Sequence, residues 1–317
     1  MKSKPPLRIV LCAPRGFCAG VVRAIDVVEK ALEIYGAPVY VRHEIVHNKH
    51  VVDSLKAKGV VFISDLAEAP VGDRPVIFSA HGVAKGVREE AKARNLLTID
   101  ATCPLVTKVH REAQLHHKRG RHVLLIGHPG HPEVIGTVGQ LPDCATTLIG
   151  SVDEVEVLEF PADAPLAYVT QTTLSVDDTR EIVAALKRRF PAIHAPPLED
   201  ICYATANRQE AIKRAVAEVE AVIVVGAVNS SNSQRLREVA ERAGCTLAVL
   251  APNAAAIEWP RFADVRSLAV TAGASAPEIL VEQILDAFAE RFAIAVEMLT
   301  TSEESMFFPL PRDLREA

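Results

Sequence analysis

The chain alternates short apolar runs with amphipathic stretches over most of its length. Runs such as 7–11 and 222–226 are too short for a helix, and they predict buried strands. After the first run, Val21, Ile25 and Val28 repeat at the spacing of one helix face. Because strands and helices alternate in this way, the sequence predicts an α/β protein with mainly parallel sheets.

Further segments follow the same two patterns. Strands are predicted at 39–41, 60–63, 76–78, 123–127, 147–149, 167–169, 247–250 and 268–270. Helices are predicted at 21–35, 51–58, 84–93, 134–140, 178–190, 207–219, 234–243 and 278–292, and from Cys103 to about 117. Near the end, Met306, Phe307 and Phe308 predict that the tail returns as a strand or as an apolar clip.

This order of elements occurs three times, and each time one cysteine stands at the start of a helix. Cys18, Cys103 and Cys202 are about 90 residues apart, a repeat length that indicates similar domains. The predicted units cover 1–102, 103–201 and 202–300, and a C-terminal tail follows at 301–317. Arranged with pseudo-threefold symmetry, three such α/β units would bring their cysteines together at a central metal cluster.

The cysteines carry the first candidate chemistry. The amides and the dipole of a helix N-terminus favour a thiolate, and the glycines around Cys18 allow a ligand to approach the backbone closely. Three converging thiolates can hold zinc, a 3Fe–4S cluster, or a 4Fe–4S cluster with one iron open. The alternative is that they are unrelated buried thiols. Cys12, Cys144 and Cys245 have no repeat partner and are predicted to be core or surface thiols.

Polar segments follow the predicted strands of each unit, where parallel sheets bind ligands. They are rich in neutral donors that can hold a small phosphorylated ligand together with helix N-termini. The candidates are His47, His81, His131, Thr172, Thr173, Ser230, Ser231, Asn232 and Ser275. Helix capping is an equally good explanation for the Ser, Thr and Asn residues among them. Glu133 either occupies an ordinary acidic position at a helix start or donates protons beside the metal.

Composition limits the classes of function. Hydrophobic residues make up 49% of the 317 residues and charged residues 24%, which is typical of a globular protein. A net charge of −5, without basic residues interleaved with aromatics, argues against nucleic-acid binding. No apolar run approaches the roughly 18 residues of a membrane helix, and the N-terminal run is too short for a signal peptide. The sequence therefore predicts a soluble, cytoplasmic protein.

Nine motifs, which span most of the chain in order, carry a family resemblance. They are PRGFCAG at 14–20, VRHEIVHN at 41–48, FSAHGV at 78–83, DATCPLVTKVH at 100–110, GHPGHPE at 127–133, TQTTLSVDDT at 170–179, DICYATANRQEA at 200–211, NSSNS at 229–233 and TAGASAP at 271–277. In these motifs the chain resembles the 4-hydroxy-3-methylbut-2-enyl diphosphate reductases, LytB-type iron–sulfur oxidoreductases of the non-mevalonate pathway of isoprene biosynthesis.

The resemblance implies one 4Fe–4S cluster per chain, with Cys18, Cys103 and Cys202 as ligands and an open iron that binds the substrate hydroxyl. Glu133, assisted by Thr172, would relay protons. Two electrons and two protons would remove the hydroxyl as water and leave isopentenyl and dimethylallyl diphosphate. The implied diphosphate ligands are His47, His81, His131, Thr173, Ser230, Asn232 and Ser275, with Ser231 beside them. The electron donor would be a protein such as ferredoxin or flavodoxin.

Two other functions stay open from the residues alone. A zinc-dependent hydrolase or isomerase of a small phosphorylated substrate would use Glu133 as its base. A non-enzymatic iron–sulfur protein that senses redox state would need the cysteines but not Glu133. The two readings therefore differ from the reductase in the metal that they need and in the role of this carboxyl group.

Overall fold

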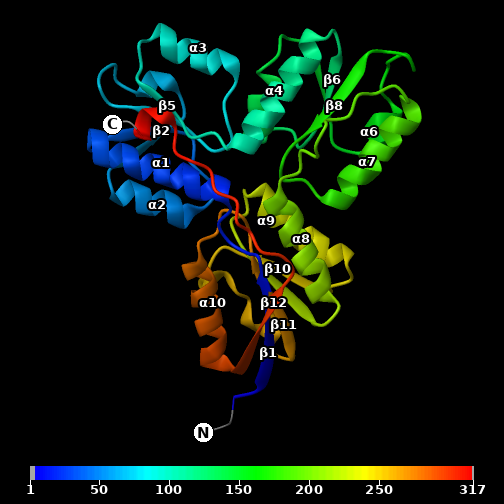
Figure 1. Ribbon diagram of the computed structural model, residues 1–317. Helices are drawn as coiled ribbons and strands as arrows, with labels where there is room; N and C mark the ends of the chain where they lie inside the picture. The colour runs from blue at the N-terminus through cyan, green and yellow to red at the C-terminus, as the bar shows by residue number, and fades with distance from the viewer. Residues whose placement is uncertain (1–3, 316–317) are drawn as a thin grey trace. The chain divides into compact units, whose positions relative to one another are not determined.

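The structure is a computed structural model that describes residues 4–315 (Figure 1). These residues form three sheets, of five, four and three strands, and every neighbouring pair of strands is parallel. Helices follow most of the strands along the chain. The prediction of an α/β protein with three mainly parallel sheets is therefore confirmed.

The described residues fall into two compact units, and each is assembled from separate parts of the chain. Unit 1 consists of 4–18, 47–49 and 203–306. Unit 2 consists of 19–46, 50–202 and 307–315. The first contains the five-stranded sheet and the second contains the other two. The boundaries of the three domains expected from the sequence stay a prediction.

The sheet of unit 1 has the strand order β10-β9-β11-β1-β12. Its strands are β1 (Pro6–Ala13), β9 (Ala221–Val225), β10 (Leu247–Ala251), β11 (Ser267–Ala272) and β12 (Ala293–Thr300). The helical elements are α8 (Tyr203–Val216), α9 (Ser231–Arg242), η2 (Ala254–Ala256), η3 (Trp259–Phe262) and α10 (Glu278–Arg291). Ile223 belongs to the core shared with α10, whereas Val222 belongs to the core shared with α8 and α9. Burial on both faces explains why β9 is apolar throughout.

The larger sheet of unit 2 has the order β3-β2-β4-β5, and the smaller has the order β7-β6-β8. The strands are β2 (Val39–Arg42), β3 (Val60–Ile63), β4 (Val76–Phe78), β5 (Thr98–Asp100), β6 (His122–Ile126), β7 (Thr146–Ile149) and β8 (Leu166–Thr170). The helical elements are α1 (Ala19–Tyr35), α2 (Lys49–Ala57), η1 (Leu66–Glu68), α3 (Lys85–Ala93), α4 (Pro104–Lys118), α5 (Pro132–Val138), α6 (Val152–Glu156), α7 (Val176–Arg189) and α11 (Arg312–Arg315). α2 begins with Lys49, the last residue of a short segment of unit 1.

Two features of the chain ends were not expected from the sequence. β1 pairs with β11 and β12 in unit 1, and not with the strands that follow it in the chain. The tail prediction is wrong, because 301–311 has no regular structure and Phe307 is 75% exposed. The edge beside β1 is already occupied by β12, which pairs along its full length from Ala293 to Thr300.

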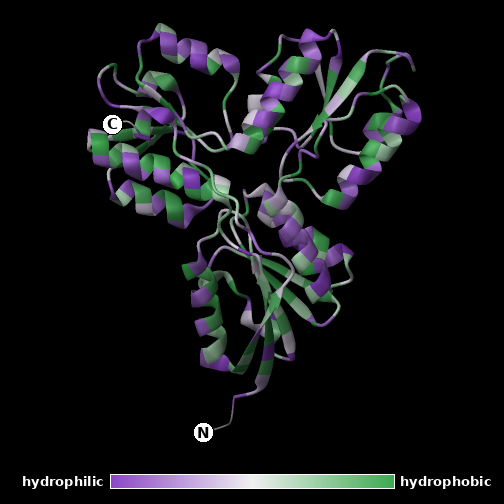
Figure 2. Ribbon diagram, viewed as in Figure 1, coloured by the Kyte–Doolittle hydropathy of each residue, from purple (hydrophilic) through white to green (hydrophobic). Residues whose placement is uncertain are grey.

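Hydrophobic residues predominate along the strands, and hydrophilic residues alternate with them along the helices (Figure 2). This is the distribution of helices that bury one face against a sheet. Within residues 4–315, no helix combines the length and the apolar composition that a membrane span requires.

Candidate active site

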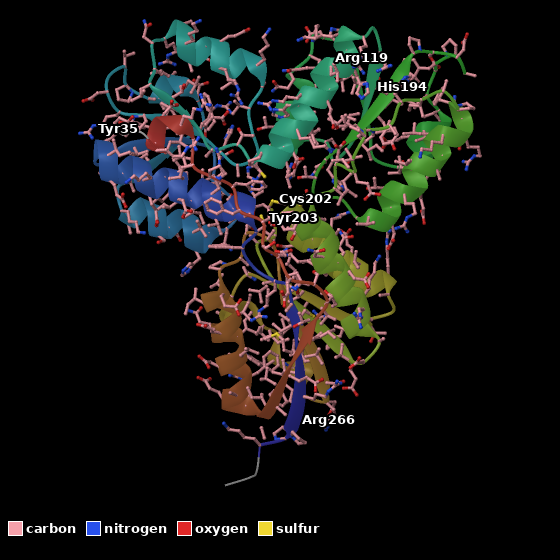
Figure 3. All side chains as sticks on the ribbon, viewed as in Figure 1. Tyr35, Arg119, His194, Cys202, Tyr203 and Arg266 are labelled. Carbon is pink, nitrogen blue, oxygen red and sulfur yellow. The ribbon has the colours of Figure 1, made fainter. Side chains whose placement is uncertain are left out.

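The three repeat-related cysteines occupy the same kind of position in the fold. Cys18 directly precedes α1, and Cys103 is the N-cap of α4. Cys202 directly precedes Tyr203, where α8 begins, and Figure 3 labels these two residues. All three are half-buried. Each thiol therefore lies at the start of a helix, as the sequence predicts.

The backbone anchors the cysteines in a repeated way. Each amide donates to a carbonyl in a polar segment that follows a strand: Cys18 to Ala274 at 3.2 Å, Cys103 to Ala80 at 2.9 Å, and Cys202 to Thr172 at 3.0 Å. These carbonyls lie after β11, β4 and β8, respectively. Each of these three cysteines is therefore hydrogen-bonded through its amide to one of the polar segments that the sequence identified as ligand-binding candidates.

The other cysteines have different surroundings. Cys12 is fully buried in the core of unit 1, and burial raises the pKa of its thiol to about 12. Burial also raises the pKa of Cys245, and Cys144 is exposed. They are core and surface thiols, as the sequence predicts. A thiol that resists ionisation is a poor metal ligand, since metals bind the thiolate.

The donor set of Cys18, Cys103 and Cys202 fits a metal cofactor chemically. Within the described residues no cysteine forms a disulfide. Soft thiolates at helix N-termini suit an iron–sulfur cluster or zinc. Among residues 4–315, no three His, Cys, Asp or Glu side chains are grouped so that they could hold a metal ion.

Glu133 is a buried acid with fixed orientation. It lies in the first turn of α5 and is 3% exposed. Its Oε1 accepts the amide of Thr172 at 2.7 Å, and its Oε2 accepts the Thr172 hydroxyl at 2.9 Å. Burial raises the pKa of Glu133 to about 7, while the two bonds from Thr172 oppose this rise and the charge of Asp200 adds to it. The carboxyl group can therefore both hold and release a proton near neutral pH.

Two histidines lie beside this acid in unit 2. His131 caps α5, and its Nδ1 accepts the amide of Glu133 at 3.2 Å. A neutral His131 then carries its proton on Nε2, which makes that nitrogen a donor. His81 packs edge-on against His131, with ring centroids 5.9 Å apart. Unit 2 thus brings together a proton-holding acid and two imidazoles.

The polar candidates of unit 1 form a second group. The Ser275 hydroxyl donates to the His47 carbonyl at 3.0 Å. Asn232 accepts a hydrogen bond from the amide of Ala274 through Oδ1 at 2.9 Å. The carbonyl of the same Ala274 accepts the amide of Cys18. Ser231 is the first residue of α9 and is half-buried. The structure therefore places His47, Asn232 and Ser275 around the segment that anchors Cys18.

Among the Ser, Thr and Asn candidates, for which capping was the alternative, the structure shows Ser230 as a helix cap. Ser230 is the N-cap of α9, and its side chain accepts the amide of Ser233. α7 begins at Val176, slightly before the predicted start at 178, and is capped by Ser175, so that Thr172 and Thr173 do not cap it. α10 has Pro277 at its N-cap and no side-chain cap. Capping therefore does not explain the threonines or Ser275.

The buried side chain of Gln171 also belongs to this site, and the sequence analysis did not predict it. Gln171 donates to the Thr173 hydroxyl at 2.8 Å and accepts the amide of His128 at 3.0 Å. It is 1% exposed and connects the two polar segments that contain Thr173 and His131. Its position inside the TQTT motif was the available signal, but its role depends on a contact between distant segments.

Comparisons with known proteins agree over the whole chain. The family model described as LytB protein matches residues 9–289. A 4-hydroxy-3-methylbut-2-enyl diphosphate reductase of Beijerinckia indica subsp. indica is 64% identical over 317 residues, covering 100% of this chain and 99% of that protein. A protein of the same name from Methylocella silvestris is 65% identical with the same coverage. The structure of the E-1-hydroxy-2-methyl-but-2-enyl-4-diphosphate reductase from Plasmodium falciparum matches with a TM-score of 0.95 and 39% identity, covering 98% of each chain.

Proposed function

The chain belongs to the LytB protein family, and we propose that it catalyses the reductive dehydroxylation of 4-hydroxy-3-methylbut-2-enyl diphosphate. Two electrons and two protons replace the C–O bond of the substrate hydroxyl by a C–H bond and release water. The products are isopentenyl and dimethylallyl diphosphate. The chain is thus an oxidoreductase of isoprenoid biosynthesis.

The observation that carries this proposal is the state of Glu133. Loss of a hydroxyl as water needs a proton donor, and an efficient donor has a pKa near the working pH. The carboxyl group of Glu133 is buried, has a pKa of about 7, and is oriented through both oxygens by Thr172. The Thr172 hydroxyl can donate and accept, so it can pass a proton to and from Glu133.

We propose a 4Fe–4S cluster as the cofactor, with the thiolates of Cys18, Cys103 and Cys202 as its ligands. When bound, such a cluster supplies electrons and a Lewis-acidic iron. The choice of ligands is supported by the shared position of these cysteines at helix N-termini and by the raised pKa of Cys12 and Cys245.

Neutral donors hold the diphosphate in this proposal. Helix N-termini and uncharged side chains can bind phosphate oxygens without forming strong ion pairs. The proposed ligands are His47, His81, His131, Thr173, Ser230, Ser231, Asn232 and Ser275. A ferredoxin or flavodoxin would deliver electrons to the enzyme in the cytoplasm.

The test is an anaerobic assay with 4-hydroxy-3-methylbut-2-enyl diphosphate and dithionite as the reductant. We expect both five-carbon diphosphates to form. Glu133→Gln keeps the shape of the side chain but removes the titratable proton, so we expect turnover to fall about 100-fold or more while iron content is unchanged. Product without iron would contradict the cofactor, and full turnover by Glu133→Gln would remove Glu133 from its role. Iron-loaded protein without product would favour a redox sensor, and zinc-loaded protein would favour a hydrolase.

A further inference from the structure

Lys108 binds the loop that leads to a proposed cluster ligand. It lies on α4, the helix that Cys103 caps, and its ammonium group is directed at the segment just before Cys202. The group donates to the carbonyl of Leu198 at 2.8 Å, the carbonyl of Glu199 at 3.2 Å and the Oδ1 of Asp200 at 2.9 Å. One side chain therefore connects the helix that starts at one cysteine with the loop that ends at another.

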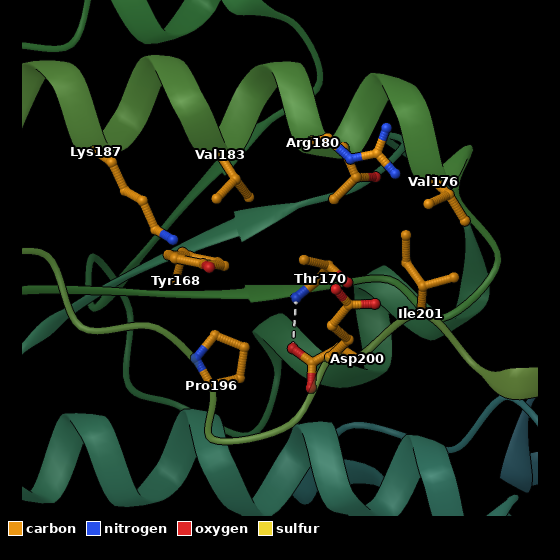
Figure 4. Close-up of a pocket in the computed structure, with 11 residues that line it drawn as sticks. Tyr168, Thr170, Val176, Arg180, Val183, Lys187, Pro196, Asp200 and Ile201 are labelled. Atoms are coloured by element: carbon orange, nitrogen blue, oxygen red, sulfur yellow. Dashed lines mark hydrogen bonds between the residues drawn. The ribbon is translucent and has the colours of Figure 1, made fainter. Parts of the chain in front are cut away.

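The same loop is fixed to β8 on its other side. The fully buried side chain of Asp200 accepts the amide of Thr170 through Oδ2 at 2.9 Å (Figure 4). A cavity of about 230 Å³ opens beside the loop, with Val183 and Pro196 in its wall. Polar contacts help to hold the loop beside this space. Two of them come from Asp200 and Lys108.

Arg23 makes an equivalent contact between the first cysteine and the second: it follows Cys18 and binds the loop before Cys103. It lies on α1, which follows Cys18, and it is 9% exposed. Its guanidinium donates to the carbonyl of Thr102 at 3.0 Å and to that of Asp100 at 3.4 Å. Thr102 directly precedes Cys103. The helix after the first cysteine thus holds the loop before the second.

Arg208 completes the series. It lies on α8, which follows Cys202, and its side chain is fully buried. Two of its nitrogens donate to the carbonyl of Gly16, at 2.7 and 3.2 Å, and Glu304 pairs with its charge at 2.9 Å. Gly16 lies two residues before Cys18. Its φ of +67° is a backbone conformation that is strained for any residue with a side chain.

We propose that Arg23, Lys108 and Arg208 are positioning residues for the three cysteine ligands. Each lies five or six residues after one cysteine and binds backbone carbonyls just before the next one, and the last of the three returns to the first cysteine. The inference rests on the proposed cluster, and it assigns these cations a task that the substrate-binding residues do not perform.

Charge-assisted bonds suit this task. A cation that donates to several carbonyls binds more strongly and with more defined geometry than a neutral donor. Partners that orient metal ligands typically change metal affinity 10- to 100-fold when they are removed. Each of the three cations donates to backbone carbonyls of the loop before a cysteine, so its loss should loosen the ligand without removing it.

The test uses full-length protein reconstituted anaerobically with iron and sulfide. We expect Lys108→Met to lose iron to a ferrous chelator about tenfold faster than the parent and to change the electron paramagnetic resonance spectrum of the reduced cluster. Lys108→Arg should restore both, because a guanidinium can donate to the same loop. Cys103→Ser serves as the reference for loss of a ligand.

Arg189→Met is the matched control. Arg189 donates to the carbonyl of Val155 at 3.0 Å and to that of Leu158, so its bonds join α7 to α6 and to the segment after α6. Equal iron loss and an unchanged spectrum in Lys108→Met and the parent would overturn the proposal. So would equal effects of Lys108→Met and Arg189→Met, which would show a general loss of stability.

Two further arms keep the result decisive. If Lys108→Met does not fold, Asp200→Asn removes the ion pair while it keeps the size of the side chain, and the same two readouts apply. A parent protein that takes up no cluster would refute the proposed cofactor, and this inference with it. If the parent holds its cluster, and the variants match it in iron loss and in spectrum, the positioning role alone would be refuted.

Discussion

At the scale of single residues, Glu133 derives its chemistry from burial. An acidic residue in the first turn of a helix is ordinary, and there its pKa would stay low because the helix N-terminus favours the charge. In this fold it is 3% exposed, and burial outweighs the hydrogen bonds from Thr172. The result is an acid that is half protonated near neutral pH. Its position in the sequence is compatible with both roles, and burial decides between them.

The raised pKa predicts how stability depends on pH. Glu133 titrates near 4.5 in the unfolded chain and at about 7 in the folded one. Below pH 4.5 both states are protonated, and above it the unfolded state gains stability by releasing its proton first. The free energy of unfolding should therefore fall between pH 4.5 and 7, by on the order of 3 kcal/mol for this group.

Urea unfolding of the apoprotein and of Glu133→Gln, measured at pH 5 and pH 8, isolates this effect. Glutamine does not titrate, so the variant should gain stability relative to the parent as the pH rises. A stability difference that is the same at both pH values would contradict a raised pKa.

At the scale of elements, helix starts separate structural from functional hydroxyl groups. Ser175 caps α7 and accepts the amide of Asp178 at 3.3 Å, whereas Thr172 points its hydroxyl at Glu133. The motif TQTTLS offers several possible caps, and local sequence does not distinguish them. α7 begins at Val176, after the Ser175 cap, and this leaves Thr172 available for its contact with Glu133.

Ser175→Ala should lower the free energy of unfolding by about 1 kcal/mol, because it leaves an amide of the first turn without its acceptor. The exposed Ser305 lies outside regular structure and provides the control substitution, Ser305→Ala. Thermal unfolding of both variants tests the assignment. Equal melting temperatures for the two would show that Ser175 does not cap the helix.

At the scale of the whole molecule, the C-terminal segment serves both compact units. Glu304 pairs with the buried Arg208 in unit 1, and the carbonyl of Pro309 accepts Nε of Arg23 in unit 2 at 2.9 Å. The tail has little regular structure, yet it supplies partners to two buried cations. Part of its contribution to stability is therefore electrostatic, although Leu314 is also buried, and the expected apolar clip is absent at the exposed Phe307.

A chain that ends after residue 300 should be less stable than one that ends after 306, because only the first loses Glu304. A buried charge without its partner costs about 3–5 kcal/mol. Glu304→Gln in the full chain should reproduce most of this loss. Urea unfolding of the three apoproteins provides the comparison, and equal stability of the two truncated chains would contradict the role of Glu304.

The sequence by itself determined where the strands and helices lie and which cysteines stand at helix starts. Apolar runs and helical spacing are local properties, and they predicted nearly every strand and helix, the three parallel sheets, and Cys18, Cys103 and Cys202 at helix starts. Tertiary structure decided what depends on distant segments. It placed β1 beside β12, buried Glu133 under Thr172, and directed Lys108 to the loop before Cys202. Such contacts form between residues that are far apart in the sequence and close in space, and local sequence patterns do not show which distant residues will meet.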